Sequence, residues 1–265
     1  MSEDEIILTH ILQCKPIDLL VNKPVLSSVQ QERFNDYRRR REDGEPLQYI
    51  LGTCNFMGLE LAVNPAVLIP RPETEQLVDT ALKYFKGRAA LDLGTGSGNI
   101  AIALAKFVPQ SLIVSVDVSA KALEVARTNA RRHEVEDRIQ FIHDDFFLSL
   151  QTRQSPWSSA CNSNVFDLII SNPPYIPTVL LSTLPKDVQE EPARALDGGE
   201  DGLNFYRIII KYTPCLLREG ACLMMEFGDG QAEAIKKLIE AREAFSGIEL
   251  IQDLAGRDRI IKATR

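Results

Sequence analysis

The stretch Asp92-Leu93-Gly94-Thr95-Gly96-Ser97-Gly98 lies between an apolar segment at residues 89–93 and a segment of helical periodicity at residues 98–107. Glycine permits positive φ and lets a ligand come close to the backbone. The first turn of a helix offers N–H groups that have no partner within the helix. A strand, a glycine-rich turn and a helix in this order are therefore typical of a nucleotide-binding loop. The motif is weak when it stands alone, because many turns contain glycine.

Asp117 strengthens this interpretation. It follows the next predicted strand, at residues 112–116, and lies 19 residues after Gly98. A carboxylate at this place can accept the hydroxyl hydrogens of an adenosine ribose. The glycines are spaced G-x-G-x-G, whereas dinucleotide-binding loops use G-x-G-x-x-G. The tighter spacing resembles the loop of class I S-adenosylmethionine-dependent methyltransferases, whose cofactor carries no phosphate. The resemblance implies that the cofactor is bound by Gly94, Thr95, Gly96, Ser97, Gly98 and Asp117.

A polar segment, His143-Asp144-Asp145-Phe146, follows the third predicted strand at residues 139–142. By the same resemblance, Asp145 accepts a hydrogen from the adenine amino group and Phe146 packs on the adenine ring. Two alternatives stay open at this point. The segment can be an ordinary polar loop, or its His and two Asp residues can bind a metal. Nothing nearby in the sequence completes a ligand set, so we expect no metal.

The segment Ser171-Asn172-Pro173-Pro174-Tyr175 follows a predicted strand at residues 165–170. Two prolines end a strand and make a rigid turn, but they do not explain the asparagine before them or the tyrosine after them. Asn-Pro-Pro-Tyr resembles the signature of methyltransferases that act on planar nitrogens, which are those of adenine, cytosine or the glutamine amide. The resemblance places Asn172 beside both the cofactor and the substrate.

The chemistry of a planar nitrogen explains these residue types. Its lone pair is delocalised, so its two N–H bonds must be held while the lone pair faces the methyl donor. The side-chain oxygen of Asn172 can accept one hydrogen and the carbonyl oxygen of Pro173 the other. Tyr175 can stack on the flat amide, and Pro174 keeps the turn rigid. Such positioning can lower a barrier by about 7–11 kcal/mol at best.

From residue 73 onward, segments of helical and strand periodicity alternate. The alternation predicts an α/β fold with a Rossmann-like, doubly wound sheet that helices cover on both faces. Two terminal strands joined by a short loop at Gly256 predict that the last strand is antiparallel. Ligands of such sheets bind at the carboxyl ends of the strands. In the methyltransferase strand order the glycine loop and the Asn-Pro-Pro-Tyr loop are neighbours.

The first third of the chain has a different pattern. Residues 6–12 form an apolar stripe at helical spacing, and Ser27 or Ser28 can cap a second helix that ends near Gly44. Residues 47–70 predict short extended pieces, among them residues 50–52, and a hairpin. We therefore expect a small helical substrate-docking domain at residues 1–46, a β-hairpin linker at 47–72 and a methyltransferase domain at 73–265. Residues 149–164 predict a polar surface loop. The arginine run at 38–41 either contacts an acidic partner or is a solvated helix end.

Three further segments make the resemblance more specific. They are Gly44-Glu45-Pro46-Leu47-Gln48-Tyr49-Ile50-Leu51-Gly52, Leu68-Ile69-Pro70-Arg71-Pro72-Glu73-Thr74-Glu75 and Glu191-Pro192-Ala193-Arg194-Ala195-Leu196-Asp197-Gly198-Gly199. With the two core motifs, they resemble the HemK/PrmC family, the glutamine methyltransferases of peptide chain release factors. The resemblance implies methylation of the glutamine in the GGQ (Gly-Gly-Gln) motif of class I release factors. It also implies that Arg71 and Glu75 order the cofactor site and Glu191 a lid; the alternative is that they form salt bridges and caps between linker and catalytic domain.

The composition narrows the alternatives. A net charge of -7 argues against a protein that grips long duplexes. A DNA adenine methyltransferase, the main alternative, would have to flip a base and hold duplex DNA. A non-catalytic Rossmann-type binding protein is the other alternative, although it has no use for the Asn-Pro-Pro-Tyr loop. The odd number of cysteines, five, and the acidic N-terminus predict reduced thiols in a cytoplasmic protein. We expect a monomer without direct contact to nucleic acid or membrane.

Overall fold

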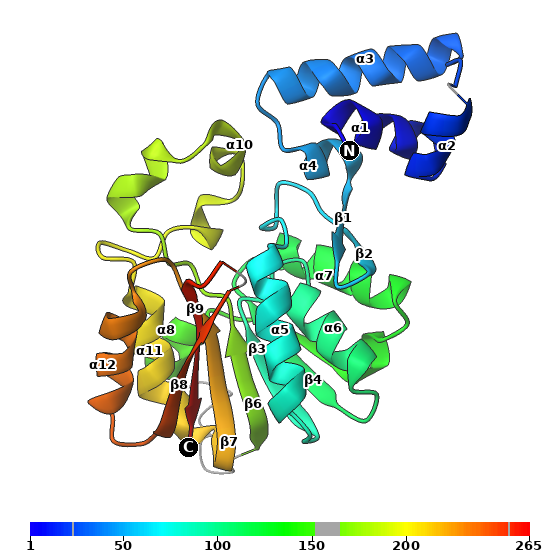
Figure 1. Ribbon diagram of the computed structural model, residues 1–265. Coiled ribbons are helices and arrows are strands. Elements are labelled where there is room, and N and C mark those ends of the chain that lie inside the picture. Colours follow the sequence, from blue (N-terminus) through cyan, green and yellow to red (C-terminus); the bar gives the residue numbers. More distant parts are fainter. Residues whose placement is uncertain (23, 152–164, 254) are drawn as a thin grey trace.

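The computed structural model describes residues 1–22, 24–151, 165–253 and 255–265. A unit of N-terminal helices sits above one edge of a larger α/β domain, and a two-stranded hairpin lies between them (Figure 1). No helix in the described ranges is long and apolar enough to cross a membrane.

The α/β domain is built on a seven-stranded sheet with the order β5-β4-β3-β6-β7-β9-β8. Its neighbouring strands β3 to β7 pair in parallel, and β9 pairs antiparallel with both β7 and β8. The doubly wound sheet with an antiparallel last strand is therefore confirmed. The strands span Ala89–Leu93 (β3), Leu112–Asp117 (β4), Ile139–His143 (β5), Phe166–Ser171 (β6), Leu217–Glu226 (β7), Ser246–Gln252 (β8) and Asp258–Thr264 (β9).

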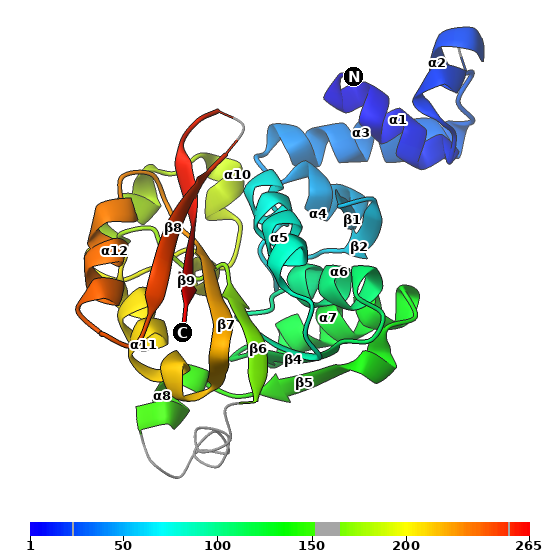
Figure 2. The ribbon, with the colours of Figure 1, turned by 60° about the horizontal axis from the view of Figure 1, so that its bottom comes forward.

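Helices cover both faces of this sheet (Figure 2). One face carries α5, α6 and α7, and its core contains Leu77, Leu104 and Ala130. The other face carries α8, α11 and α12, with Tyr206 and Ile235 in a second core. These helices span Pro72–Tyr84 (α5), Asn99–Phe107 (α6), Ala120–Arg132 (α7), Phe146–Gln151 (α8), Asn204–Tyr212 (α11) and Ala232–Glu240 (α12).

The local sequence explains where these helices begin and end. Pro72 stands at the first position of α5, where a missing N–H costs nothing. Ser119 accepts the N–H of Ala122 and so caps α7. Pro214 ends α11 in a short 3₁₀ turn, η4 (Thr213–Cys215).

The N-terminal unit contains α1 (Glu3–Leu12), α2 (Pro16–Asn22), α3 (Ser28–Glu42) and α4 (Leu47–Leu51). Ser2 and Ser27 each make a capping box, with Glu5 and Gln30 as the reciprocal partners. The pattern of the sequence did not predict α2, which is only seven residues long.

The expectation of an extended piece at residues 50–52 is wrong for residues 50 and 51. They lie in α4, where Leu47 and Ile50 are one helical turn apart and both face the cluster of Ile7, Ile11 and Tyr37. Burial against α1 and α3 therefore decides the local conformation, because five residues are too few to form a stable helix alone. Gly52 ends α4 with φ of 76°.

The predicted hairpin is confirmed, as β1 (Thr53–Phe56) and β2 (Leu59–Ala62). Met57 and Gly58 form the turn, with φ of 51° and 79°, which suits a two-residue turn of the primed type. Asn129 of α7 accepts the N–H of Ala62 and donates to its carbonyl. The hairpin is thus hydrogen-bonded to the α/β domain.

Between β6 and α11 the chain runs through η2 (Thr178–Thr183), α10 (Lys186–Gln189) and η3 (Ala193–Ala195). This stretch, residues 176–203, lies near the end of α3 (Figure 1), and Arg41 of α3 is 3.4 Å from Asp187 of α10. The whole arginine run at 38–41 is paired with carboxylates of the chain. This pairing argues against the interpretation that the run waits for an acidic partner.

Two other expectations have mixed outcomes. The polar loop predicted at 149–164 falls mostly on 152–164, outside the described residues, and residues 149–151 belong to α8. Cys14, Cys54 and Cys222 are free thiols as expected, but Cys215 is disulfide-bonded, so the expectation of reduced thiols throughout is wrong there. An odd number of cysteines means that they cannot all be paired in disulfides, but it does not exclude a single disulfide bond.

Candidate active site

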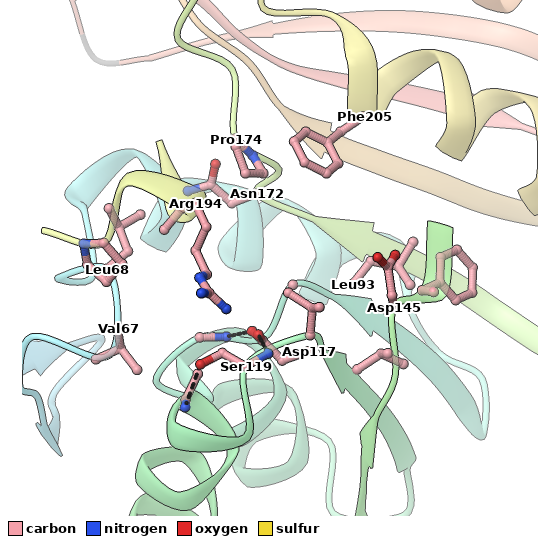
Figure 3. A pocket seen from close by; sticks show the side chains of 18 of the residues that line it. Val67, Leu68, Leu93, Asp117, Ser119, Asp145, Asn172, Pro174, Arg194 and Phe205 are labelled. Atoms are coloured by element: carbon pink, nitrogen blue, oxygen red, sulfur yellow. Dashed lines mark hydrogen bonds between the residues drawn. The ribbon is translucent and has the colours of Figure 1, made fainter. Parts of the chain in front are cut away.

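A pocket lies at the carboxyl ends of β3, β4, β5 and β6, where a doubly wound sheet binds its ligands (Figure 3). It is an open pocket with a cavity volume of ≈ 240 Å³. Two parts of the chain outside the sheet complete it, residues 66–68 after the hairpin and the 176–203 stretch. Its walls include Val67, Leu68, Leu93, Gly94, Gly96, Val116, Asp117, Ser119, Asp145, Phe146, Asn172, Pro174, Arg194 and Phe205.

The glycine loop after β3 is held by the end of β4. The amides of Gly94 and Thr95 donate to the carbonyl of Val116 at 2.9 and 3.1 Å. Gly94 and Gly96 have φ of 78° and 56°, and a Cβ at either place would meet nothing within 4 Å. Both therefore leave their backbone open to the pocket, as the predicted cofactor requires.

Gly98 serves a different purpose, because it begins α6 with φ of 83°. A Cβ there would lie 2.9 Å from Cδ1 of Ile102 and 3.1 Å from Cβ of Ala126. The third glycine of the motif therefore allows α6 and α7 to pack closely and does not line the pocket.

Replacing Gly98 by alanine is expected to lower the free energy of unfolding by about 2–4 kcal/mol, because a strained φ and an overpacked contact add together. Urea unfolding measures this loss. Gly220→Ala is the matched control, since Gly220 has φ of 77° with nothing within 4 Å of an added Cβ. That control should lose only about 1–2 kcal/mol. Equal losses in the two variants would contradict the packing argument.

Asp117 lines the pocket at the end of β4. Its two oxygens accept the N–H groups of Gly96 and Ser119 at 2.9 and 2.8 Å. Burial raises the pKa of Asp117, and the nearby Arg194 guanidinium acts in the opposite direction. Each carboxylate oxygen keeps further acceptor capacity, so ribose hydroxyls can still bind there.

Arg194 is a pocket residue that the sequence reasoning missed. It comes from η3, and Figure 3 shows its side chain extending toward Asp117. The segment Glu191 to Gly199 carried a family resemblance, and that was the available signal. Periodicity could not place this irregular segment over the pocket.

Thr95 and Ser97 do not line the pocket with their side chains. Both are 1% exposed, and Thr95 Oγ1 lies 3.1 Å from Ser115 Oγ. Beneath the loop, one carboxylate oxygen of the buried Asp92 and the hydroxyl of Ser97 have no hydrogen-bond partner among the described residues. Burial raises the pKa of Asp92 to about 7. These side chains support the loop from below.

Asp145 and Phe146 both line the pocket, as the sequence predicts. Asp145 also caps α8, because its Oδ1 accepts the N–H of Leu148 at 3.0 Å. Its second oxygen keeps its acceptor capacity, while the Phe146 ring is 3% exposed and forms an apolar wall. Within the described part of the chain, no group of three His, Cys, Asp or Glu residues could hold a metal ion.

The Asn-Pro-Pro-Tyr loop is fixed beside the glycine loop, because Ser171 Oγ donates to the carbonyl of Leu93 at 2.7 Å. Asn172 and Pro174 line the pocket. The side-chain NH₂ of Asn172 donates to Thr74 Oγ1 at 2.9 Å. Among the residues described, none donates a hydrogen bond to Asn172 Oδ1 or to the Pro173 carbonyl oxygen. Asn172 Oδ1 is therefore available at the pocket, whereas Pro173 is buried and is not among the residues that line the pocket.

The structure does not bring Tyr175 into the pocket. A Cβ on Gly228 would lie 2.9 Å from its ring, and burial raises the pKa of its hydroxyl to about 12. The aromatic ring beside Pro174 at the pocket belongs to Phe205, in the first turn of α11 (Figure 3). Nothing in the sequence pattern indicates this, since Phe205 has the spacing of an ordinary core residue.

The resemblance assigned roles at the cofactor site and in a lid to three charged residues, Arg71, Glu75 and Glu191. In the structure they bond backbone amides and form an ion pair between segments, which was the alternative interpretation. Glu75 accepts the N–H of Met57 in the hairpin turn at 2.7 Å. Glu191 is buried, accepts the N–H of Ile69 and forms an ion pair with Arg71. They join the hairpin and the 176–203 stretch to the catalytic domain.

Comparison with solved structures supports the fold. The catalytic domain of hMettl16, in complex with a MAT2A 3′UTR hairpin, is 15% identical with a TM-score of 0.60, over 90% of this chain and 82% of that one. A methyltransferase from Pyrococcus furiosus is 17% identical with a TM-score of 0.56, over 90% and 98% of the two chains. Identities this low show similarity of fold alone.

Sequence comparisons show the family. Residues 85–245 match the family described as Methyltransferase domain, and residues 2–52 match the PrmC N-terminal domain. The release factor glutamine methyltransferase of Geobacter sulfurreducens is 45% identical over 84% of this chain and 74% of its own. The enzyme of the same name from Moorella thermoacetica is 41% identical over 88% and 80%. That of Thermodesulfovibrio yellowstonii is 37% identical over 98% and 91%. The fold, the pocket and these relatives agree, and the chain belongs to the release factor glutamine methyltransferase family.

Proposed function

We propose that this chain transfers a methyl group from S-adenosylmethionine to the side-chain amide nitrogen of the glutamine in the Gly-Gly-Gln loop of class I peptide chain release factors. The observation that supports the proposal is the pattern of hydrogen bonds at the Asn172 carboxamide. Its NH₂ donates to Thr74, and its oxygen, at the pocket, accepts no hydrogen bond from the described residues. The carbonyl oxygen of Pro173, a buried residue that does not line the pocket, also accepts none from them. The names of the curated relatives support the same reaction.

Two oxygens hold the glutamine amide in this proposal. Asn172 Oδ1 accepts one N–H hydrogen and the Pro173 carbonyl oxygen the other, so the nitrogen lone pair faces the pocket. When bound, S-adenosylmethionine supplies a methyl carbon on a positively charged sulfur. Transfer would form a bond from the nitrogen to that carbon as the carbon–sulfur bond breaks, and the nitrogen would then lose a proton to solvent. Holding the amide in this fixed geometry is the main source of the rate acceleration.

The residues at the pocket fit the cofactor in chemistry. Gly94 and Gly96 leave the backbone open to it, Asp117 can accept the ribose hydroxyl hydrogens and Asp145 the adenine amino hydrogens. Phe146 provides an apolar wall for the ring. Tyr175, which the sequence assigned to the substrate, reaches the amide only if its ring leaves Gly228.

A labelled-methyl assay tests the proposed function. The protein is incubated with S-adenosylmethionine carrying a labelled methyl group and with either an unmethylated class I release factor or plasmid DNA. We expect label in the release factor and none when its Gly-Gly-Gln glutamine is replaced by alanine. Label in DNA instead would favour the adenine methyltransferase, and cofactor binding without transfer to either would favour the non-catalytic binding protein.

We also propose that residues 1–46 dock the release factor, that 47–72 act as a linker and that 73–265 carry out the reaction. The reaction would take place in the cytoplasm and would need one copy of the chain, without nucleic acid or membrane. An exposed apolar surface supports docking by the helical domain. Around α2 and the start of α3, five large apolar side chains are 57–95% exposed: Ile17, Leu20, Val21, Val25 and Val29. Such clusters mark sites of protein contact.

Replacing Val25, the most exposed of these residues at 95%, by glutamate is expected to raise the KM for an intact release factor about tenfold. A short Gly-Gly-Gln peptide cannot reach α2, so turnover of the peptide should stay at the wild-type level. Leu112→Glu is the control, because Leu112 is 60% exposed at the amino end of β4, opposite to the pocket. Steady-state kinetics with both substrates gives the comparison. Equal KM values for Val25→Glu and the wild type with the intact factor would contradict docking at this surface.

A further inference from the structure

A chain of two hydrogen bonds, the first partly buried and the second buried, leads away from the Asn172 carboxamide. Asn172 Nδ2 lies 2.9 Å from Thr74 Oγ1, and Thr74 Oγ1 lies 2.7 Å from Glu226 Oε2. Thr74 and Glu226 are each 1% exposed. They come from the first turn of α5 and the end of β7, on either side of the Asn-Pro-Pro-Tyr loop. A buried polar group costs free energy when it lacks a hydrogen-bond partner, so each member of this chain depends on its neighbours.

The donors and acceptors in this chain can be assigned in one way while Glu226 is ionised. A carboxylate can only accept, and a threonine hydroxyl has a single hydrogen to donate. Thr74 therefore donates its hydrogen to Glu226, and its oxygen can only accept from the third member. That member is the NH₂ of Asn172. The carboxamide oxygen must then be on the side away from Thr74.

We propose that Thr74 and Glu226 are positioning residues, which fix the Asn172 carboxamide with its oxygen available to the substrate nitrogen. The inference rests on the proposed function. The two ends of a carboxamide have nearly the same shape, so rotation by half a turn costs little in packing. A rotated Asn172 would offer an NH₂ group to the NH₂ of the substrate glutamine, and neither group can accept. The hydrogen-bond chain from Glu226 through Thr74 to Asn172 therefore selects the one carboxamide orientation that can hold the substrate.

Protonation of Glu226 would release this selection. A protonated carboxyl can donate to Thr74, whose hydrogen is then free to bond the oxygen of a rotated Asn172. Burial raises the pKa of Glu226 to about 7. The hydrogen bond with Thr74 lowers this pKa, as do Arg259 of β9 and the Asn172 carboxamide, whereas Glu73 of α5 raises it. The hydroxyls of Tyr175 and Tyr206 are the other titratable groups nearby.

The first test compares Thr74→Val with Thr74→Ser. Valine keeps the shape without the hydroxyl, so turnover of a Gly-Gly-Gln peptide should fall about tenfold to a hundredfold. Serine restores the hydroxyl and should keep turnover within about threefold. The dissociation constant for S-adenosylmethionine, measured by calorimetry without substrate, should stay within about twofold in both. If the wild-type enzyme did not methylate the peptide at all, the proposed function would be contradicted. If the wild type were active and the valine and serine variants had equal activity, the positioning role of Thr74 and Glu226 would be overturned.

The second test uses Glu226→Gln and pH. As pH falls through about 7, Glu226 gains a proton, so wild-type turnover should fall at saturating substrates. The introduced carboxamide does not titrate and can both donate and accept, so the Glu226→Gln variant should be slower at pH 8 and lack this fall. Glu249→Gln, at a surface ion pair on β8, should keep the wild-type profile. If Glu226→Gln kept the fall, another group such as Asp92 would cause it, and the role of Glu226 would be overturned.

Discussion

Asn172→Ala is expected to lower turnover about a hundredfold or more, while the dissociation constant for S-adenosylmethionine stays near the wild-type value. The substitution removes the acceptor for one substrate N–H bond, and this acceptor matters most while the nitrogen attacks. The glycine loop and Asp117 keep their own contacts, which do not involve Asn172. Single-turnover kinetics with saturating cofactor, together with calorimetry of cofactor binding, separates the two quantities.

The opposite outcome is easily recognised. If cofactor binding collapsed in Asn172→Ala while turnover per bound complex survived, Asn172 would be a cofactor residue only. The melting temperature should be measured as well, because the substitution also removes one of the two hydrogen-bond partners of the Thr74 hydroxyl.

Asp117→Ala is expected to weaken S-adenosylmethionine binding about tenfold to a hundredfold, with turnover nearly restored at saturating cofactor. A hydrogen bond to a charged group contributes about 1.5–3 kcal/mol, which corresponds to this range. The variant also loses the acceptor for the Gly96 and Ser119 amides, so the glycine loop itself becomes less ordered. Calorimetric titration with the cofactor measures the change.

Asp167→Ala provides a matched control for this prediction. Asp167 accepts two backbone amides, those of Arg88 and Ala89, at the amino end of β6, which is the end opposite to the pocket. Its loss should lower the free energy of unfolding without changing cofactor affinity. If both variants weakened the cofactor equally, the effect would come from general loss of stability and the role of Asp117 would be wrong.

The sequence predicts the catalytic domain well because its signals are local. A strand, a glycine turn and a helix occupy consecutive residues, and the acid at Asp117 follows at a fixed distance in the chain. The prolines after Asn172 also act locally. The parallel pairing of β3 with β6 then brings the two loops together, as the family strand order implies.

The parts that the sequence did not predict depend on contacts between distant segments. Thr74 and Glu226 meet Asn172 only after α5, β6 and β7 have packed, and each looks like an ordinary residue of its own element. Phe205 has the spacing of a core residue, although it lines the pocket. Tyr175 is the last residue of the Asn-Pro-Pro-Tyr motif, but its ring packs on Gly228 outside the pocket.

The most direct test of the account is a crystal structure of this protein with S-adenosylhomocysteine and a Gly-Gly-Gln peptide. We expect the glutamine Nε2 to lie within hydrogen-bond distance of both Asn172 Oδ1 and the Pro173 carbonyl oxygen, with Asn172 Nδ2 still bonded to Thr74. The sulfur should lie on the side of the nitrogen that its lone pair faces. A glutamine amide bound elsewhere, or an Asn172 that presents its NH₂ to the substrate, would contradict the central claim.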